Sequence, residues 1–316
     1  MYQDAVSYAI GSLPPVYHWG LFVALGCLLA GAWLLTQSRV DERKRNTAAL
    51  TCLLSLVLGL LFARLVYAFA EVQFAPYRTA ATALDIRLGG FSMFGALAGA
   101  VLGALWAARI DRVDALEWLD QLAPALLLFV FAARLGEGGT ALGISRPLVT
   151  GVLDDTFLAY RDAYDAYLRT YLLESFGALV LFLFSLRIAR RVKRSGGVFL
   201  WTALMFGISQ NLFESLRYDG HLRFSFIGLQ QLLAVTLFSV ALISLAMQLI
   251  RRKDHRGLGI AALAILPLLL AAILGLEFMV DRSSISKWLI YGLYVVVLAG
   301  AGALGSALLR RSGYNG

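Results

Sequence analysis

Apolar runs of about twenty residues recur along the whole chain, separated by short polar connections. A helix of that length crosses a hydrocarbon core of about 30 Å, so each run is a candidate membrane span. The pattern predicts an all-α polytopic membrane protein with about nine transmembrane helices and small extracytoplasmic loops or a cap. The predicted spans cover residues 16–36, 48–72, 89–108, 119–134, 167–186, 198–216, 226–250, 260–280 and 288–309.

The composition agrees with this class and excludes a soluble protein. Hydrophobic residues make up 59% of the chain and charged residues 15%, and the mean hydropathy is +0.74. Residues 1–15 contain neither a basic region nor a small-residue cleavage site. We therefore expect the first helix to be retained rather than removed as a signal peptide.

Lysine and arginine gather in alternate connections, which indicates an orientation. By the positive-inside rule these segments are cytoplasmic, so we expect the N-terminus outside and the C-terminus in the cytoplasm. The net charge of +8 is then mainly a topology signal, and we expect contact with the bilayer but not with nucleic acid. The basic segments are residues 38–46, 109–118, 187–196, 251–257 and the tail after residue 309.

The cysteines and histidines indicate neither a disulfide nor a metal site. Cys27 and Cys52 lie within apolar spans, where cysteine packs as a small hydrophobe. His18, His221 and His255 are scattered along the chain. We expect no metal and no cofactor.

One arginine, Arg134, ends the fourth apolar run. An arginine at the middle of a span costs roughly 2.5–3.5 kcal/mol, so such a residue usually faces a polar interior and marks a functional site. Four glycines follow it, at positions 136, 138, 139 and 143, and can bring backbone N–H groups close to an anion or a lipid head group. The alternative is a helix end with a snorkelling arginine above a flexible loop.

Three other outer segments are candidates to meet Arg134. Between residues 95 and 103, three glycines spaced four apart form one small-residue face, which favours packing against another helix. Gly89, Gly90 and Ser92 precede this face and are candidates to line a head-group pocket.

The second segment is the long connection 137–166, which we interpret as a cap over a site. The third leaves the sixth span with Glu214, Arg217 and His221 at helical spacing. Its simpler interpretation is an interfacial cluster of satisfied charges.

Seven short segments resemble, in one order over residues 8 to 240, the motifs of a known family. Arg64 and Tyr67 lie in ARLVYAF, which is similar to "GRLGYV", and Glu174 lies in RTYLLESFGAL, which is similar to "PSQLYEAL". The other pairs are YAIGSLPPVYHWGL with "IGPL…WYGL", GGFSMFGAL with "GGMSFHGGL", DQLAPALLL with "DLIAPALAL", ARLGEGG with "GRIGNFxN", and FGISQNLFESLRYDG with "YGxxRFxxExxRxPD", followed by FIGLQQLL in the place of "MGQxLS".

On these motifs the chain resembles a divergent member of the prolipoprotein diacylglyceryl transferase family. These membrane enzymes move diacylglycerol from phosphatidylglycerol to a lipobox cysteine. The resemblance implies that Arg134 and Arg217 handle phosphate, with Glu214 as their support and Glu137 as a further catalytic candidate. The substrate-binding candidates are Trp19, Arg64, Tyr67, Gly89, Gly90, Ser92, Phe94, Gly136, Gly143 and His221.

The chain departs from the family motifs at five positions that bear on the chemistry. The family histidine is Phe94 here, its tyrosine is Trp19 and its asparagine is Glu137. Gln210 replaces an arginine and Arg169 a proline. A base for the attacking thiol is therefore open among three residues, Glu137, Glu214 and His221.

Three functions remain open. The first is a diacylglyceryl transferase of the bacterial plasma membrane, acting on phosphatidylglycerol or another anionic phospholipid and on lipobox-containing prolipoprotein signal peptides. The second is a non-catalytic or re-purposed phospholipid-binding protein that keeps the cavity without the family histidine. The third is a structural membrane subunit, which would leave the arginine pair unexplained. We expect residues 1–250 to form the seven-helix transferase-like domain and residues 251–316 a two-helix extension.

Overall fold

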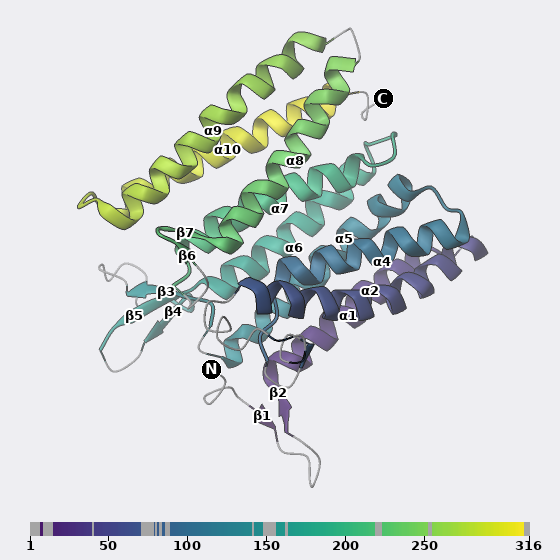
Figure 1. Ribbon diagram of the computed structural model, residues 1–316, viewed down its shortest axis with the longest axis horizontal. Coiled ribbons are helices and arrows are strands. Elements are labelled where there is room, and N and C mark those ends of the chain that lie inside the picture. Colours follow the sequence, from purple (N-terminus) through teal and green to yellow (C-terminus); the bar gives the residue numbers. More distant parts are fainter. Residues whose placement is uncertain are drawn as a thin grey trace. The chain divides into compact units, whose positions relative to one another are not determined.

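Nine α-helices dominate the part of the chain that the computed structural model describes, and each corresponds to one predicted span (Figure 1). The described residues are 7–8, 15–39, 41–70, 79, 81, 84–85, 89–140, 142–147, 156–161, 164–218, 223–251 and 255–312. The helices are α1 (His18–Gln37), α2 (Glu42–Ala70), α4 (Met93–Asp111), α5 (Ala115–Leu135), α6 (Thr170–Ala189), α7 (Gly197–Leu216), α8 (Leu229–Arg251), α9 (Arg256–Arg282) and α10 (Lys287–Arg311).

Among the described residues, eight helices are long and apolar enough to cross a membrane. The protein is therefore an all-α polytopic membrane protein, as the apolar pattern predicts. The helix outside this set is α7, which has the required length but carries Gln210, Asn211 and Glu214 near its C-terminal end. These polar side chains lower its hydropathy.

Four helices, α1, α4, α6 and α8, begin two to four residues later than the apolar runs suggest, and α4 and α6 show that local backbone structure precedes them. Gly89 and Gly90 have positive φ angles of 66° and 79°, so the chain turns there instead of starting a helix. The helix α4 begins after Ser92, whose hydroxyl accepts a hydrogen bond from the Gly95 amide at 3.3 Å. The helix α6 begins at Thr170 because the preceding residues form a strand, β5 (Ala166–Arg169).

The chain divides into two compact units. The first contains residues 1–182 and 216–222, and the second contains residues 183–215 and 223–316. In the first unit α1 packs against α2 and α5, and α4 packs against the same two helices. These four helices therefore form a closed bundle.

The glycine face of α4 packs directly against the backbone of α2, which confirms the packing interpretation. A Cβ atom added at Gly95 or Gly99 would clash with the carbonyl oxygens of Phe62 and Leu58, respectively. At Gly103 the added atom would lie 2.7 Å from the Ser55 nitrogen. The absence of side chains on three successive turns lets the two helix backbones approach closely.

The long connection after α5 is structured where it is described. A 3₁₀ turn, η3 (Gly136–Gly139), leads to β3 (Ile144–Pro147) and then to β4 (Ala159–Arg161). With β5 they form an antiparallel sheet in the order β3-β5-β4. On β5, Ala166 and Leu168 are buried and alternate with Tyr167 and Arg169, which are half-exposed, as expected for a sheet with one covered face.

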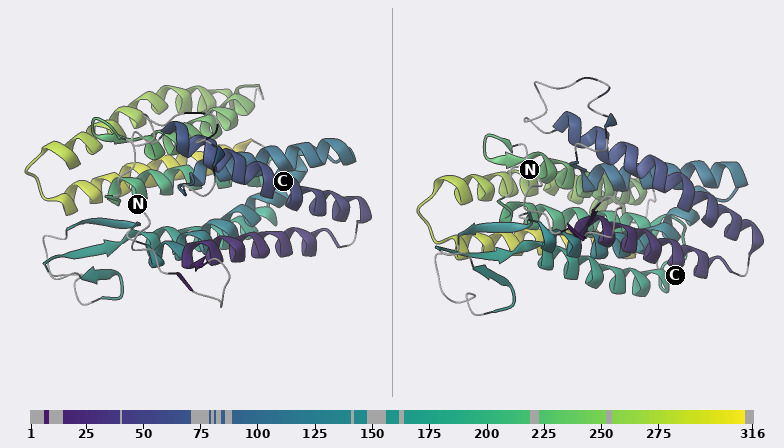
Figure 2. Two further views of the ribbon diagram at one scale, coloured as in Figure 1. Left: turned by 60° about the horizontal axis from the view of Figure 1, so that its bottom comes forward. Right: turned by 90° about the horizontal axis from the view of Figure 1, so that it is seen from below.

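The strands of the first unit lie at the end of its helices where α1 begins (Figure 2). A short pair, β1 (Ser7–Tyr8) and β2 (Val16–Tyr17), runs directly into α1. The α1–α2 and α4–α5 connections of this unit lie close together. Near them Lys44 Nζ lies 2.5 Å from Glu117 Oε1, and Thr47 Oγ1 donates to Asp111 at 2.8 Å. Both connections lie at the opposite end of the bundle.

The second unit consists of α7, α8, α9, α10 and the last turns of α6. The helices α8, α9 and α10 pack on one another, and Gly207 of α7 fits against Ala234 and Phe238 of α8. A short hairpin of β6 (Arg223–Phe224) and β7 (Ile227–Gly228) precedes α8.

The predicted orientation is tested by placing single cysteines at Ser195 and Thr156. We expect Ser195→Cys to be protected from an impermeant thiol reagent in intact cells and Thr156→Cys to react, because the positive-inside rule assigns their loops to opposite sides. The unmodified protein is the control, since its two cysteines are half-buried within α1 and α2. Labelling of Ser195→Cys from outside the cell would contradict the predicted orientation.

The packing of α2 on α4 predicts that Gly99→Leu destabilises the protein. Four added carbon atoms have no space against the Leu58 backbone, and over-packing of this kind costs about 1–3 kcal/mol. The melting temperature in detergent measures the effect. Gly300→Leu is the matched control, because a Cβ atom at Gly300 in α10 meets nothing within 4 Å. Equal melting temperatures for the two variants would contradict the close approach.

Candidate functional site

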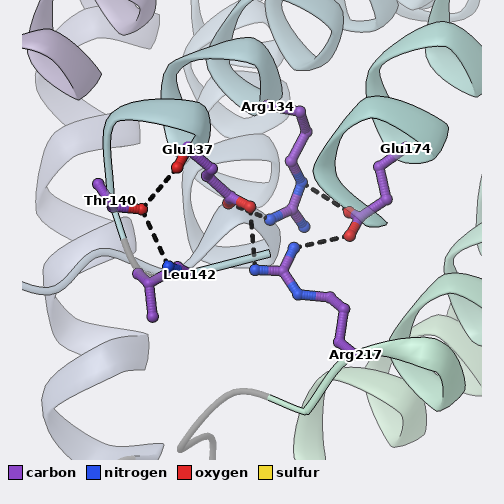
Figure 3. Close-up of polar contacts among 6 residues, drawn as sticks. All are labelled: Arg134, Glu137, Thr140, Leu142, Glu174 and Arg217. Atoms are coloured by element: carbon purple, nitrogen blue, oxygen red, sulfur yellow. Dashed lines mark hydrogen bonds and ion pairs between the residues drawn. The ribbon is translucent and has the colours of Figure 1, made fainter. Parts of the chain in front are cut away.

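Four charged side chains of the first unit form a closed arginine–glutamate ring, made by Arg134, Glu137, Glu174 and Arg217 (Figure 3). Arg134 Nη1 donates to Glu137 Oε1 at 2.5 Å, and Arg134 Nε lies 2.7 Å from Glu174 Oε2. Arg217 Nη1 donates to Glu174 Oε1 at 2.6 Å, and Arg217 Nη2 lies 3.0 Å from Glu137 Oε2. Each arginine therefore contacts both glutamates.

The ring is buried and electrically balanced. The relative exposures are 6% for Arg134, 7% for Glu137, 0% for Glu174 and 2% for Arg217. Isolated charges at such burial would carry a large desolvation penalty, which close pairing offsets. The formal charges of these two guanidinium groups and two carboxylates sum to zero.

The end of α5 positions two members of the ring. Arg134 lies in the last helical turn, where the negative end of the helix dipole favours a cation. Glu137 follows three residues later in η3 and so lies on the same side of the chain. Thr140 fixes this turn, because its hydroxyl donates to the Glu137 carbonyl at 2.7 Å and accepts from the Leu142 amide at 3.1 Å.

The helix α6 brings Glu174 to Arg134 through contacts on either side of it. The Ser175 hydroxyl donates to the Phe131 carbonyl of α5 at 2.7 Å, which fixes the two helices at the level of the ring. The Tyr171 amide donates to the Gly143 carbonyl at 3.0 Å. Gly143 has a φ of 74°, a conformation that favours glycine, and turns the chain from η3 into β3.

Arg217 enters the ring from the residue directly after α7. Ser145 and Arg217 form an isolated antiparallel bridge, and the Tyr218 amide donates to the Ile144 carbonyl at 2.9 Å. The Arg146 guanidinium lies 4.9 Å from the centre of the Tyr218 ring. The strand β3 therefore holds the backbone at Arg217 and Tyr218, and the sheet of β3, β4 and β5 takes part in building the site.

The first group of substrate-binding candidates comes together around a turn in the first unit. The Arg64 side chain is 1% exposed, and its Nη1 atom donates to the carbonyls of Gly89 and Gly90. The Tyr67 ring fills the space where a Cβ atom of Gly90 would lie. The Ser92 amide donates to a carbonyl of α2, that of Ala63, at 2.9 Å. Arg64 thus holds the glycine turn that precedes α4.

The second group lies near the start of α1. Trp19 stacks on Phe91 with ring centres 5.6 Å apart, and Gly136 fits against Trp19 and Phe22 of α1. Phe94 is half-buried in the first turn of α4. A Cβ atom at Gly143 would lie 2.8 Å from Glu137 Oε2, so this glycine borders the ring directly.

Two predicted residues are not placed in the ring. Glu214 is half-buried in α7, in the second unit, and His221 lies outside the described residues. Instead, Glu174 of the neighbouring helix α6 pairs with both arginines. The sequence motifs matched the position of Glu174 but gave it no function. The sequence feature that could have identified Glu174 is its position as the one carboxylate within the apolar run of α6, because such a residue in a span normally faces a polar partner.

Helices long and apolar enough to span a membrane, together with a buried arginine–glutamate ring, define a polytopic membrane protein with a charged cluster inside its helical fold. The sequence model described as "Prolipoprotein diacylglyceryl transferase" matches residues 6–247. The chain belongs to this family.

The curated relatives agree. Proteins named phosphatidylglycerol–prolipoprotein diacylglyceryl transferase from two strains of Bacillus cereus and from Bacillus anthracis are each 27% identical to this chain over 259 residues. The matched part covers 79% of this chain and 93% of each relative. The helices α9 and α10 lie beyond the segment that the family model matches.

The ring predicts that Glu174→Gln lowers stability strongly although it preserves the shape of the side chain. The substitution leaves two buried arginines with one carboxylate, and removing one partner of a buried ion pair costs about 3–5 kcal/mol. Thermal unfolding in detergent measures the loss. Glu117→Gln, which breaks the half-exposed pair with Lys44, is the control and should cost at most about 1 kcal/mol. Similar losses for both would mean that the ring does not stabilise the fold.

Proposed function

We propose that the protein is a phosphatidylglycerol–prolipoprotein diacylglyceryl transferase of the bacterial plasma membrane. The donor is phosphatidylglycerol, and the acceptor is the thiol of a lipobox cysteine in a prolipoprotein signal peptide. The observation that carries the proposal is the arginine–glutamate ring, because two buried guanidinium groups at the end of membrane helices match the phosphate of an anionic lipid. Family membership and the named relatives support the same reaction.

The reaction transfers a diacylglyceryl group from oxygen to sulfur. The cysteine thiolate attacks the glycerol carbon that carries the phosphate, and a carbon–sulfur bond forms while the carbon–oxygen bond breaks. Glycerol phosphate leaves with the electron pair of the broken bond, and the thiol proton goes to a base or to water. Stabilising the departing phosphate is the main electrostatic requirement, since a free thiol already ionises in part near neutral pH.

In this mechanism Arg134 and Arg217 contact the phosphate, and Glu137 and Glu174 hold the two guanidinium groups in place. Arginine suits the role because its planar fork gives two parallel hydrogen bonds to an oxyanion. Both oxygens of Glu137 lie against arginine nitrogens. Glu137 is therefore assigned as a positioning residue rather than as the base.

The glycine turn that precedes α4 contributes to the shape of the site. Arg64 holds the carbonyls of Gly89 and Gly90, and Gly143 lies next to the Glu137 carboxylate. At Gly90 and Gly143 the Tyr67 and Glu137 side chains lie where a Cβ atom would be, so glycine is required for these close approaches. We propose that Trp19, Tyr67, Ser92, Phe94 and Gly136 surround the lipid there.

The proposal is tested by transfer of labelled diacylglycerol in vesicles. Purified protein is reconstituted with phosphatidylglycerol labelled in its acyl chains and given a lipobox peptide. We expect label on the peptide, and none on a peptide whose cysteine is replaced by serine. Arg134→Ala and Arg217→Ala should each slow transfer about 10- to 150-fold, which corresponds to the loss of a charge-assisted hydrogen bond worth about 1.5–3 kcal/mol.

Two further variants make the result specific. Arg217→Lys keeps the charge but not the fork, so it should also lose most of the activity. Arg282→Ala removes an arginine whose side chain is 65% exposed at the end of α9 and should leave transfer unchanged. Wild-type protein that binds the lipid without any transfer would favour a phospholipid-binding protein. Transfer at the wild-type rate by Arg134→Ala would show that the ring takes no part in the reaction.

A further inference from the structure

A buried polar network links the last two helices to α7 within the second unit. Gln231 Nε2 of α8 donates to Glu277 Oε2 of α9 at 2.8 Å and to the Tyr294 hydroxyl of α10 at 3.0 Å. The Tyr294 hydroxyl in turn donates to Asn211 Oδ1 of α7 at 2.6 Å. All four side chains are at most 6% exposed. Polar groups this deep in a helical membrane bundle need such partners, because lipid offers none.

A second tyrosine of α10 reaches the end of α7. The Tyr291 hydroxyl donates to the Ser215 carbonyl at 3.0 Å. The last four carbonyl groups of a helix have no partner within the helix, and Ser215 is the penultimate residue of α7. Tyr291 and Tyr294 are three residues apart on α10 and therefore lie on one face. Together they contact the last two turns of α7, Tyr294 at Asn211 and Tyr291 at Ser215.

The contact between α7 and α10 continues toward the start of α7. Trp201 Nε1 donates to Ser306 Oγ at 3.4 Å, and Leu204 lies against Gly305. Residue numbers rise along α7 as they fall along α10, so the two helices are antiparallel. The helix α10 therefore contacts α7 from Trp201, in its second turn, to Ser215 near its end.

We propose that Tyr291 and Tyr294 are positioning residues for Arg217. Leu216 alone separates Ser215, which Tyr291 holds, from Arg217 in the ring. The point at which the chain leaves α7 is thus set by α10, a helix beyond the segment that the family model matches. The two-helix extension accordingly serves the phosphate-contacting arginine by fixing the helix that carries it.

The test measures backbone hydrogen exchange and transfer in the same variants. In Tyr291→Phe/Tyr294→Phe both rings remain and both hydroxyls are lost. We expect exchange in peptides covering residues 212–218 to accelerate about tenfold, since each hydrogen bond contributes a few-fold to protection. The exchange readout does not depend on activity. The transfer readout rests on the proposed function, and we expect kcat to fall with little change in KM for the peptide.

Controls separate positioning from general loosening. Tyr160→Phe removes the hydroxyl of a 45% exposed tyrosine in β4 and should change neither readout. Tyr291→Phe alone, which removes one hydrogen bond at a half-buried site, should give a smaller acceleration at the same residues.

Three outcomes are decisive. Unchanged exchange at 212–218 in the double variant overturns the inference. Equal acceleration throughout α8, α9 and α10 also overturns it, because the network would then only stabilise the second unit. Local acceleration in a protein whose wild type transfers no diacylglycerol supports the positioning by α10 and rejects the proposed function instead.

Discussion

The structure of the first unit depends on the need to pair four buried charges. Two guanidinium groups and two carboxylates come from three separate parts of the chain, and none of those parts can be displaced without leaving a charge unpaired. The local structure around them serves this geometry. A 3₁₀ turn aims Glu137, a serine-to-carbonyl bond fixes α6 against α5, and β3 holds the chain beside Arg217. The ion pairs that form the site therefore also stabilise the fold around it.

Sequence reasoning reached the helices and the two arginines because both rest on strong physical costs. Apolar runs of membrane length leave few alternatives to helices, and an arginine beside a span requires a polar partner. The resemblance to a known family supplied Arg217 as the partner position of Arg134. The glycines at 95, 99 and 103 were interpretable for the same reason, since three small residues on one helix face have a clear packing use.

The remaining features depend on tertiary contacts that sequence spacing does not encode. Glu174 and Arg134 are forty residues apart, and only the packing of α6 on α5 brings them together. The two carboxylates that contact both arginines come from η3 and α6, and sequence spacing does not predict that Glu137 and Glu174 converge. The short strands β3, β4 and β5 lie in a connection of mixed polarity without an alternating pattern long enough to predict them. Helix starts moved by a few residues wherever a turn or strand came first.

The presence of Glu137 changes how this site meets a ligand. With the asparagine that the family motif has at that position, the same cluster would carry a surplus positive charge and would attract an anion by charge alone. Here the guanidinium groups already hold carboxylate oxygens. On the proposed function, a lipid phosphate enters by taking over oxygen positions from a resident carboxylate. The affinity for the lipid then depends on how much more strongly the guanidinium groups bind the phosphate than the carboxylate that it replaces. Before a lipid arrives, the carboxylates keep the arginines oriented.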